Sequence, residues 1–559
     1  MHEPPSSPSL RQSMAWPHTW FGLVLGYVLM ACFFFGALSV FDREIDRWAI
    51  PESRFAAQPM PSFDRMLRPI FEGMQPDKES LDELRDKVNG PLPARFDVVR
   101  SWGAYTTHRD PVLGIYASYE VPGAKDPDDA AWAGRTIDPR SGAAFDDDRL
   151  KIGSGFFYPL HYSLNLHWMD LGYWIVGLAA LAMLAALVSG VVLHRKVFRE
   201  FFTFRPQKTA QRSTLDLHNM TGVLALPFHF FFAFTGLVIF AGIYFPITAT
   251  QLKPLHELHE RVEARETGLP HDRAGTPAPL ASVDAMVLEA RRRWAARGMG
   301  GEVGALSLTH VGDANGYVSV YRAGTDRVAL VGEGIHFQAS TGRVLREDPP
   351  RSAVDSVNEF LTGLHLQHFR HWLLRWLYLL GGLMGCVCIA TGFVFFVEKR
   401  KKQHAKAGSQ GSRVVDALAV TTVTGMLVAT LTILIANRLL PEALPRRGDV
   451  EQYVFWAAWA LALLHAFWRS APVARGKMNP AWREQCWAIA ALAPTAVLLN
   501  WLTTGDHLVK TVLTDTYWPV AGVDLGLLAT AALAAWAARQ LGRRALADVP
   551  SPRIKAAHA

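Results

Sequence analysis

The stretch from Val223 to Phe245 constrains this chain most, because it carries no charged side chain. A helix of that length is long enough to cross a hydrocarbon core of roughly 30 Å. His218 precedes the stretch and His229 lies within it. Ionisable side chains at membrane depth are costly and mark functional positions by default. The stretch therefore predicts a membrane-spanning helix with a functional histidine.

The two histidines share a face if this helix is continuous. At 100° per residue they project in nearly the same direction, roughly 16 Å apart along the axis. Gly222 and Gly236 fall on or near that face. Imidazole can bind iron, and missing side chains leave room for a flat ring, so the face favours haem ligation. The alternative is structural, with His218 at the interface and His229 bonded to a carbonyl in the core.

Long apolar blocks alternate with polar segments along the 559 residues, half of which are hydrophobic. This pattern predicts a membrane all-α bundle of about eight helices with two external α+β insertions. The expected order is a disordered N-terminus at 1–15, a first span at 16–41, an external region at 42–166, two spans with a basic loop at 167–246, an external domain at 247–371, a fourth span at 372–402, four further spans at 414–538 and a tail at 539–559.

Both insertions contain strand and turn signals. The first has a strand-like run at 112–121 and a strand–turn–strand pattern at 135–145. The second has a helical segment at 282–298, followed by strand-like runs and a turn at Thr341–Gly342. A helix followed by a strand meander predicts a small α+β module.

Basic residues gather in alternate loops, at 194–217, 398–413, 469–483 and after residue 539. Positively charged short loops stay in the cytoplasm, so eight spans place both termini there and both insertions outside an inner membrane. The net charge of +7 belongs to these loops, which argues for topology and against nucleic-acid binding.

The sequence contains no Gly-rich nucleotide loop after a strand, no Walker motif and no nucleophile elbow. No flavin or nicotinamide domain is therefore predicted. Any redox activity needs a separate electron donor, such as quinol or a soluble flavin.

Several short motifs carry a family resemblance. They are His18-x-Trp20-x-Gly22, DLHN at 216–219, the segments IDPRSGAAF and FQASTGRVL, and small-polar–Gly pairs at 189–190, 235–236 and 391–392. With these the chain resembles the PepSY-associated transmembrane family of bacterial inner-membrane proteins, over about residues 15–400. The long variant matches best, through 160–164, 192–206 and 364–369.

The resemblance implies a function. Members are linked to iron uptake, and some resemble ferric-siderophore reductases that carry b-type haem. The chain is thus expected to hold one or two haem b groups and to reduce ferric iron, in a siderophore or another periplasmic iron ligand. Two alternatives stay open: a non-catalytic PepSY membrane protein that binds a partner or inhibits a peptidase, and a transporter component for iron uptake.

The histidines form two layers along the expected spans. The cytoplasmic layer holds His18, His194 and His218, and the external layer holds His161, His167, His365, His368 and His371. Two layers of imidazole at opposite membrane edges suit a transmembrane electron path, because axial ligation uses a neutral ring nitrogen.

Ligand pairs follow from these layers. For the inner site we favour His218 with His18 or His194. For the outer site we favour His161 with His365, with His167 and His368 as substitutes, and His229 is open to either site. The predicted iron ligands are His218, His161 and His365. Arg375 outside and Arg195 inside are candidates for haem propionates, since Arg matches carboxylates bidentately, or they only anchor the membrane edge.

Overall fold

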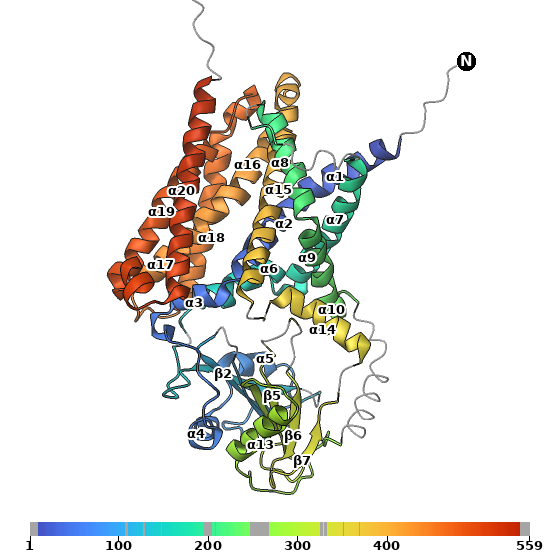
Figure 1. The fold of residues 1–559 in the computed structure, drawn as a ribbon, viewed down its shortest axis with the longest axis vertical. Helices are drawn as coiled ribbons and strands as arrows, with labels where there is room; N and C mark the ends of the chain where they lie inside the picture. The colour runs from blue at the N-terminus through green and yellow to red at the C-terminus, as the bar shows by residue number, and fades with distance from the viewer. Residues whose placement is uncertain are drawn as a thin grey trace, which may run out of the picture. The chain divides into compact units, whose positions relative to one another are not determined.

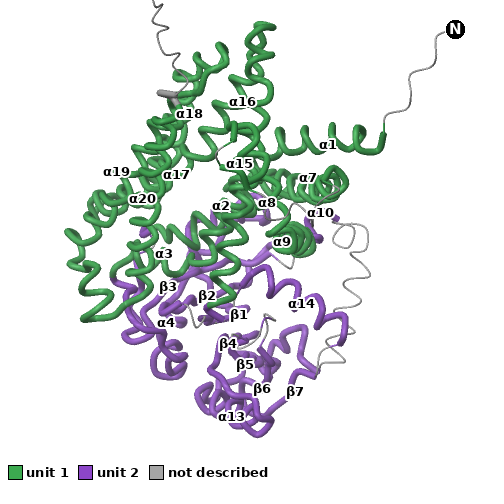
Figure 2. The backbone as a smooth tube through the Cα atoms, turned by 45° about the horizontal axis from the view of Figure 1, so that its top comes forward, with its two compact units in different colours: residues 1–51, 150–240, 373–559 green, residues 52–149, 241–372 purple. Residues whose placement is uncertain are grey.

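The computed structural model describes residues 9–106, 110–126, 129–146, 148–194, 204–206, 208–245, 268–324, 328, 332–349, 352–367, 369 and 371–547. The chain divides into two compact units (Figure 2). The membrane unit comprises Met1–Pro51, Leu150–Phe240 and Leu373–Ala559, and the insertion unit comprises Glu52–Arg149 and Ala241–Trp372.

The membrane unit is helical. Among the described residues, five segments are long and apolar enough to cross a membrane: Trp168–Leu193, Trp372–Lys406, Gly411–Leu439, Ala481–Thr504 and Trp518–Arg544. Two bent helix pairs raise the number to seven if each pair is one span. The helices are α1 (Leu10–Val24), α2 (Gly26–Ser39), α3 (Asp42–Ala49), α6 (Tyr158–Ser163), α7 (Leu171–Leu193), α8 (Ala210–Leu224), α9 (Leu226–Ile239), α15 (Trp372–Lys406), α16 (Gly411–Val420), α17 (Met426–Leu439), α18 (Arg447–Arg469), α19 (Ala481–Thr504) and α20 (Trp518–Ala547).

The prediction of one continuous helix through His218 and His229 is wrong. The segment bends by 64° between α8 and α9, at Ala225. Pro227 lies in the first turn of α9. Proline has no amide hydrogen and clashes with the carbonyl four residues earlier, so the helix must break there. His218 and His229 therefore do not share a helix face, and neither do His218 and Gly236.

The first predicted span is also bent, by 60° between α1 and α2. Gly26 begins α2, and a Cβ atom built on it would lie 3.0 Å from the Phe393 ring. The missing side chain lets α15 approach the chain at this bend.

The last four predicted spans form a helical bundle of α16–α17, α18, α19 and α20 (Figure 1). A π-helical turn at Thr421–Gly425 joins α16 to α17. Helix α18 has 23 residues but is not among the candidate spans selected by length and composition.

The insertion unit is built on one antiparallel sheet, in the order β3-β2-β1-β4-β5-β6-β7 (Figure 2). Strands β1 (Val99–Tyr105), β2 (Leu113–Glu120) and β3 (Ala130–Ile137) come from the first insertion. Strands β4 (Val303–Thr309), β5 (Tyr317–Arg322), β6 (Gly334–Gln338) and β7 (Val344–Glu347) come from the second. Pairing of β1 with β4 joins them. The two insertions predicted as separate modules thus share one sheet.

Among the described residues, this unit has the helices α4 (Arg68–Gly73), α5 (Lys78–Leu84), α10 (Ala241–Tyr244), α13 (Val283–Ala296) and α14 (Ala353–Leu366). Apolar residues on one face of the sheet form a core with Phe71 and Trp294, which α4 and α13 contribute. The predicted helix at 282–298 and the predicted turn at Thr341–Gly342 are both confirmed.

The two halves of the sheet repeat the same local design. After β3, the Gly142 amide donates to the Asp138 carbonyl, and after β6 the Gly342 amide donates to the Gln338 carbonyl, each at 2.8 Å. Both glycines have positive φ, 76° and 72°, which favours glycine at this turn position. A helix precedes the first strand of each half, so the insertions are two copies of one α+β pattern.

The two copies are interlocked at the starts of their helices. The Asp64 carboxylate accepts from the Ser282 hydroxyl at 2.6 Å and from the Val283 amide at 3.1 Å. The Asp284 carboxylate accepts from the Phe63 amide at 2.7 Å and from the Ser62 hydroxyl. Each aspartate thus caps the helix of the other copy, where unpaired amides need acceptors.

Candidate functional site: histidines seated on glycines

Three histidines of the membrane unit make the same contact with a neighbouring helix. Nδ1 of His18 lies 3.1 Å from the Ala186 carbonyl of α7, Nδ1 of His161 lies 2.8 Å from the Cys32 carbonyl of α2, and Nδ1 of His218 lies 2.7 Å from the Cys388 carbonyl of α15. The histidines come from α1, α6 and α8. One mode of attachment therefore recurs at three places in the bundle.

A glycine lies one helical turn beyond each of these carbonyls: Gly190 after Ala186, Gly36 after Cys32 and Gly392 after Cys388. A Cβ atom on Gly190 would lie 3.3 Å from the His18 ring, and one on Gly392 would lie 3.4 Å from the His218 ring. On Gly36 the separation from the His161 ring would be only 2.7 Å. Side chains in a helix tilt toward its N-terminus, so residue i+4 covers the carbonyl of residue i. Glycine at i+4 leaves that carbonyl open to a second donor.

This arrangement fixes the proton of each ring. A backbone carbonyl only accepts hydrogen bonds, so Nδ1 carries the hydrogen where it makes this bond. Nε2 of the neutral ring then holds the lone pair. Metal-binding histidines usually donate their other ring nitrogen to a carbonyl or carboxylate in this way. The Nδ1 contacts of His18, His161 and His218 thus leave the lone pair on Nε2, the nitrogen that a metal would bind.

His18 and His218 also lie next to each other. Their ring centroids are 6.2 Å apart and their planes are inclined by 82°. Metal–imidazole bonds are about 2 Å long, so two such bonds plus the half-widths of both rings give a centroid separation of this size. The structure thus brings together one of the two pairs predicted for the inner site.

The start of α8 is anchored just before His218. The Asp216 carboxylate is buried and accepts from Arg205 Nε at 2.8 Å and Nη2 at 2.9 Å, and Arg212 lies 3.2 Å away. Bidentate Arg–carboxylate pairs hold a fixed geometry. Asp216 belongs to the DLHN motif, so the motif fixes the position of the helix that presents His218.

His229 is fully buried in α9 and belongs to a ring cluster with Phe33 of α2. Its ring centroid lies 5.3 Å from that of Phe33. Among the described residues, neither of its ring nitrogens forms a well-aligned hydrogen bond, although the Gly381 backbone carbonyl interacts with the ring. Buried polar groups without a well-aligned hydrogen bond are rare and costly, so they need an explanation. His161 contacts the same turn of α2, through Cys32 and Gly36.

The other predicted residues take different places. His194 follows the end of α7 and is half-buried, and His167 is exposed before α7. Gly222 faces the Cys388 thiol, 3.3 Å from where its Cβ would be, and Gly236 is half-buried in α9. His365 lies in the last turn of α14, in the insertion unit, so its pairing with His161 stays a prediction. Arg195 and His368 lie outside the described residues.

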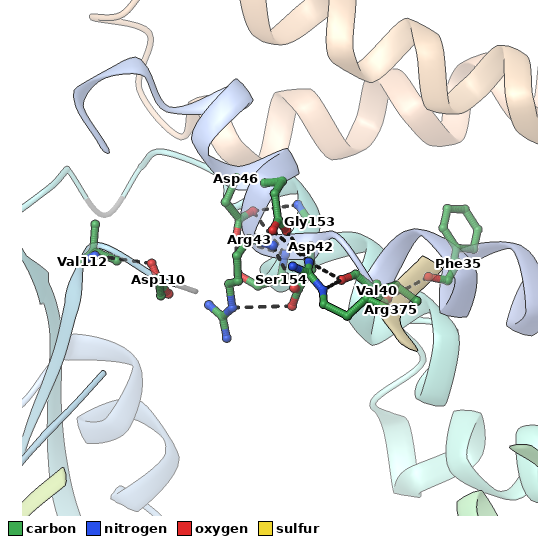
Figure 3. Close-up of polar contacts among 12 residues, drawn as sticks. Phe35, Val40, Asp42, Arg43, Asp46, Asp110, Val112, Gly153, Ser154 and Arg375 are labelled. Carbon is green, nitrogen blue, oxygen red and sulfur yellow. Dashed lines mark hydrogen bonds and ion pairs between the residues drawn. The ribbon is translucent and has the colours of Figure 1, made fainter. Parts of the chain in front are cut away.

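Arg375 has partners inside the membrane unit (Figure 3). Its Nη2 donates to the Val40 carbonyl at 2.7 Å and to the Glu44 carboxylate at 2.8 Å. The side chain is buried over the Phe41 ring. Nearby, the Asp46 carboxylate accepts from the Gly153 amide at 2.8 Å. A role for Arg375 in binding a haem propionate remains a prediction. A propionate would have to compete with the Glu44 carboxylate for the Arg375 guanidinium.

One polar cluster of the insertion unit was not anticipated. Ser319 Oγ lies 2.7 Å from His336 Nδ1, and His336 Nε2 lies 3.0 Å from the Asp348 carboxylate. Burial opposes ionisation of Asp348, but hydrogen bonds from His336 and the Gly334 amide outweigh it and hold the pKa of Asp348 below its usual value. The serine is buried within a strand, so the cluster joins neighbouring strands and presents no accessible nucleophile.

The fold and its histidines define a class: a multi-span membrane protein whose bundle seats imidazoles between helices and carries one α+β insertion unit. The model of the PepSY-associated TM region matches residues 15–399, and the chain belongs to this family. It is also similar to an uncharacterized protein of Pseudomonas aeruginosa, PA4219, with 29% identity over 407 residues that cover 69% of this chain and 94% of that protein.

Proposed function

We propose that the membrane unit binds b-type haem and passes electrons across the membrane to ferric iron, held in a siderophore or another ligand on the side of the insertions. The observation that carries this proposal is the pair of His18 and His218. Their ring centroids lie 6.2 Å apart. The Nδ1 of His18 donates to a carbonyl of α7, and the Nδ1 of His218 donates to a carbonyl of α15.

The donor set of the described residues fits a haem better than a bare metal ion. No group of three or more His, Cys, Asp or Glu among them is arranged to hold a metal. A haem supplies the other iron ligands from its own ring and needs only axial donors from the protein. Paired imidazoles meet that need, and the buried ring of His229 offers a further donor.

Haem bound in this way would supply one-electron redox chemistry, and the protein would set its ligation and burial. The residues have defined roles in that arrangement. His18 and His218 would be inner axial ligands, and His161 and His229 would be candidates for an outer site. The carbonyls of Ala186, Cys32 and Cys388 hold the ligand rings in one tautomer and one orientation.

No flavin or nicotinamide domain is predicted in this chain. The electron donor would therefore be a separate molecule, quinol or a soluble flavin. A membrane protein that only binds a partner through its insertion unit remains the second candidate. The sheet shared by the two insertions favours it, because a large folded unit outside the bundle is suited to recognition.

The first test is the visible spectrum of the full-length protein, purified from cells supplied with haem precursor. We expect a Soret band and an α-band that sharpens with dithionite. His18→Ala and His218→Ala should each lower the ratio of haem to protein by at least about one half, because a bis-imidazole site loses a strong ligand.

The matched control is His404→Ala. His404 also lies in the membrane unit, and its Nδ1 contacts the Ser412 amide at 3.1 Å. This variant should keep the haem content and spectrum of the parent protein. A colourless parent protein under these conditions, or unchanged spectra in both site variants, would refute the proposal.

A further inference from the structure

Helix α14 exposes an apolar face that the described protein does not cover. Its side chains Val354, Val357 and Phe360 are 77%, 59% and 48% exposed. Of its 14 residues only Gly363 is buried. Large apolar side chains of a folded protein that gather on one exposed face mark an interaction site.

The exposed face is continuous and narrow. At 100° per residue, six of the seven apolar side chains fall within an arc of about 120°, and only the last residue, Leu366, falls outside it. The six are Ala353, Val354, Val357, Phe360, Leu361 and Leu364. Asp355, Glu359 and Thr362 fall on the opposite side. A helix with one apolar and one charged face is the form that lies in the plane of a membrane interface.

Helix α14 has an N-terminal cap formed by residues of its own segment. The Ser352 hydroxyl accepts from the Asp355 amide at 3.1 Å, and the Asp355 carboxylate accepts from the same hydroxyl at 2.6 Å. Such a cap stabilises a helix end without contacts to the rest of the fold. The cap therefore supports the start of α14 whether or not protein covers its apolar face.

The chain itself ties α14 to the membrane. Helix α14 ends at Leu366, and the membrane-span candidate α15 begins at Trp372. The intervening residues bridge at most about 22 Å when fully extended. Trp372 and Leu373, which open α15, are exposed aromatic and apolar side chains of the kind found at a membrane boundary. The end of α14 must therefore lie near the membrane surface.

We propose that α14 is an interfacial helix, with Val354, Val357, Phe360 and Leu361 inserted among lipid acyl chains on the side of the membrane that carries the insertions. Its polar face bears Asp355 and Glu359 and no Lys or Arg. Attraction to anionic headgroups therefore does not contribute, and zwitterionic lipid is sufficient. This proposal is independent of haem binding.

The test uses site-directed spin labels on the full-length protein in phosphatidylcholine vesicles. Val357→Cys places the label on the apolar face, and Ser356→Cys, one residue away and also exposed, is the matched control. The unsubstituted protein, whose cysteines are buried or half-buried, provides the blank. Collision rates with oxygen, which concentrates in lipid, and with a water-soluble nickel chelate are compared.

We expect the label at 357 to collide several-fold more with oxygen relative to nickel than the label at 356. Adding anionic phosphatidylglycerol should leave this ratio unchanged. Equal ratios at the two positions would show that the face is in water and would overturn the proposal. Low collision rates with both reagents at 357 would overturn it too, because protein, from a second copy or another segment, would then cover the face.

Discussion

At the scale of single residues, three glycines decide where the histidines lie. A helix carbonyl already accepts one hydrogen bond from its own helix, and its second lone pair is usually covered by the side chain one turn later. Gly190, Gly36 and Gly392 remove that cover. The small-polar–Gly pairs of the sequence thus gain a physical reason at two of their three places, Ser189–Gly190 and Thr391–Gly392.

The contact distances predict a graded response to a single methyl group. Gly36→Ala should disturb the site most, since its Cβ would lie 2.7 Å from the His161 ring, and Gly190→Ala and Gly392→Ala should disturb it less, at 3.3 and 3.4 Å. Overpacking of a tight interior costs about 1–3 kcal/mol. The order of the three effects can be measured on purified variants by the Soret position, the haem retention and the thermal stability.

The control for this series is Gly22→Ala, in the same N-terminal segment, where a Cβ would have no neighbour within 4 Å. It should behave as the parent protein. Equal effects of Gly22→Ala and Gly36→Ala would contradict the interpretation of the glycines as histidine seats.

At the scale of elements, the insertion unit depends on two reciprocal helix caps. Asp64 serves the start of α13, and Asp284 serves the start of the helical segment at Phe63. Because the two contacts are equivalent, Asp64→Ala and Asp284→Ala should each destabilise this unit by about 1–2 kcal/mol. Urea-dependent limited proteolysis of the full-length protein, with cleavage followed in the insertions, measures the loss.

Asp82→Ala is the matched control, because Asp82 forms only an exposed pair with Arg85. Exposed ion pairs contribute little, so its effect should stay below about 0.5 kcal/mol. If only one of the two cap variants loses stability, the two copies are not interlocked in the way the hydrogen bonds indicate.

Elements were predictable from the sequence where the signal is local. Long apolar runs locate the spans, and Thr341–Gly342 locates a hairpin because its turn needs a glycine with positive φ. Pairing of β1 with β4 was not predictable, since Trp102 faces Leu308 across two hundred residues of chain and no local pattern records it. Pro227 was visible, but proline begins helices as often as it breaks them, and only the structure shows the bend.

The candidate site was partly predictable for the same reason. Histidines stand out in apolar stretches, so His18, His161, His218 and His229 could be selected. Their partners could not be selected. Every residue has a backbone carbonyl, so the sequence does not distinguish the carbonyls of Cys32, Ala186 and Cys388. Gly36 was missed as well, since it follows Phe35 and not a small polar residue.

At the scale of the whole molecule, the four predicted spans beyond the family match are joined to the N-terminal segment by buried polar contacts. The Trp48 indole of α3 donates to the Asp524 carboxylate of α20 at 2.8 Å, and Arg438 of α17 donates to the Ala49 carbonyl and lies over the Trp48 ring. Asp524 and Trp48 are fully buried. Buried polar groups are strongly destabilising when one partner is removed, so these helices are an integral part of the membrane unit.

Helix α18 decides the topology. Glu451, near its start, accepts from Asn437 at the end of α17 at 3.0 Å, and Ser470, just after it, accepts from Arg413 at the start of α16 at 2.7 Å. The helix therefore runs back along the whole length of α16–α17. Its 23 residues span about 35 Å, which is enough to cross the membrane. If α16–α17 is a span, α18 is the returning span, and the total is eight.

If the chain has eight spans and the basic loops lie inside, we expect both termini in the cytoplasm. Alkaline phosphatase, which is active only outside the cytoplasm, should be active when fused after Gly134, Gly316 or Ala443, and silent after Gly408 or Gly476. The fusions after Ala443 and Gly476 flank α18, so they test whether α18 crosses the membrane. Equal activity at these two sites would show that α18 does not cross the membrane, and the C-terminus would then lie outside. Activity after Gly408 would instead reverse the orientation, because the basic segment that follows α15 would then have been exported.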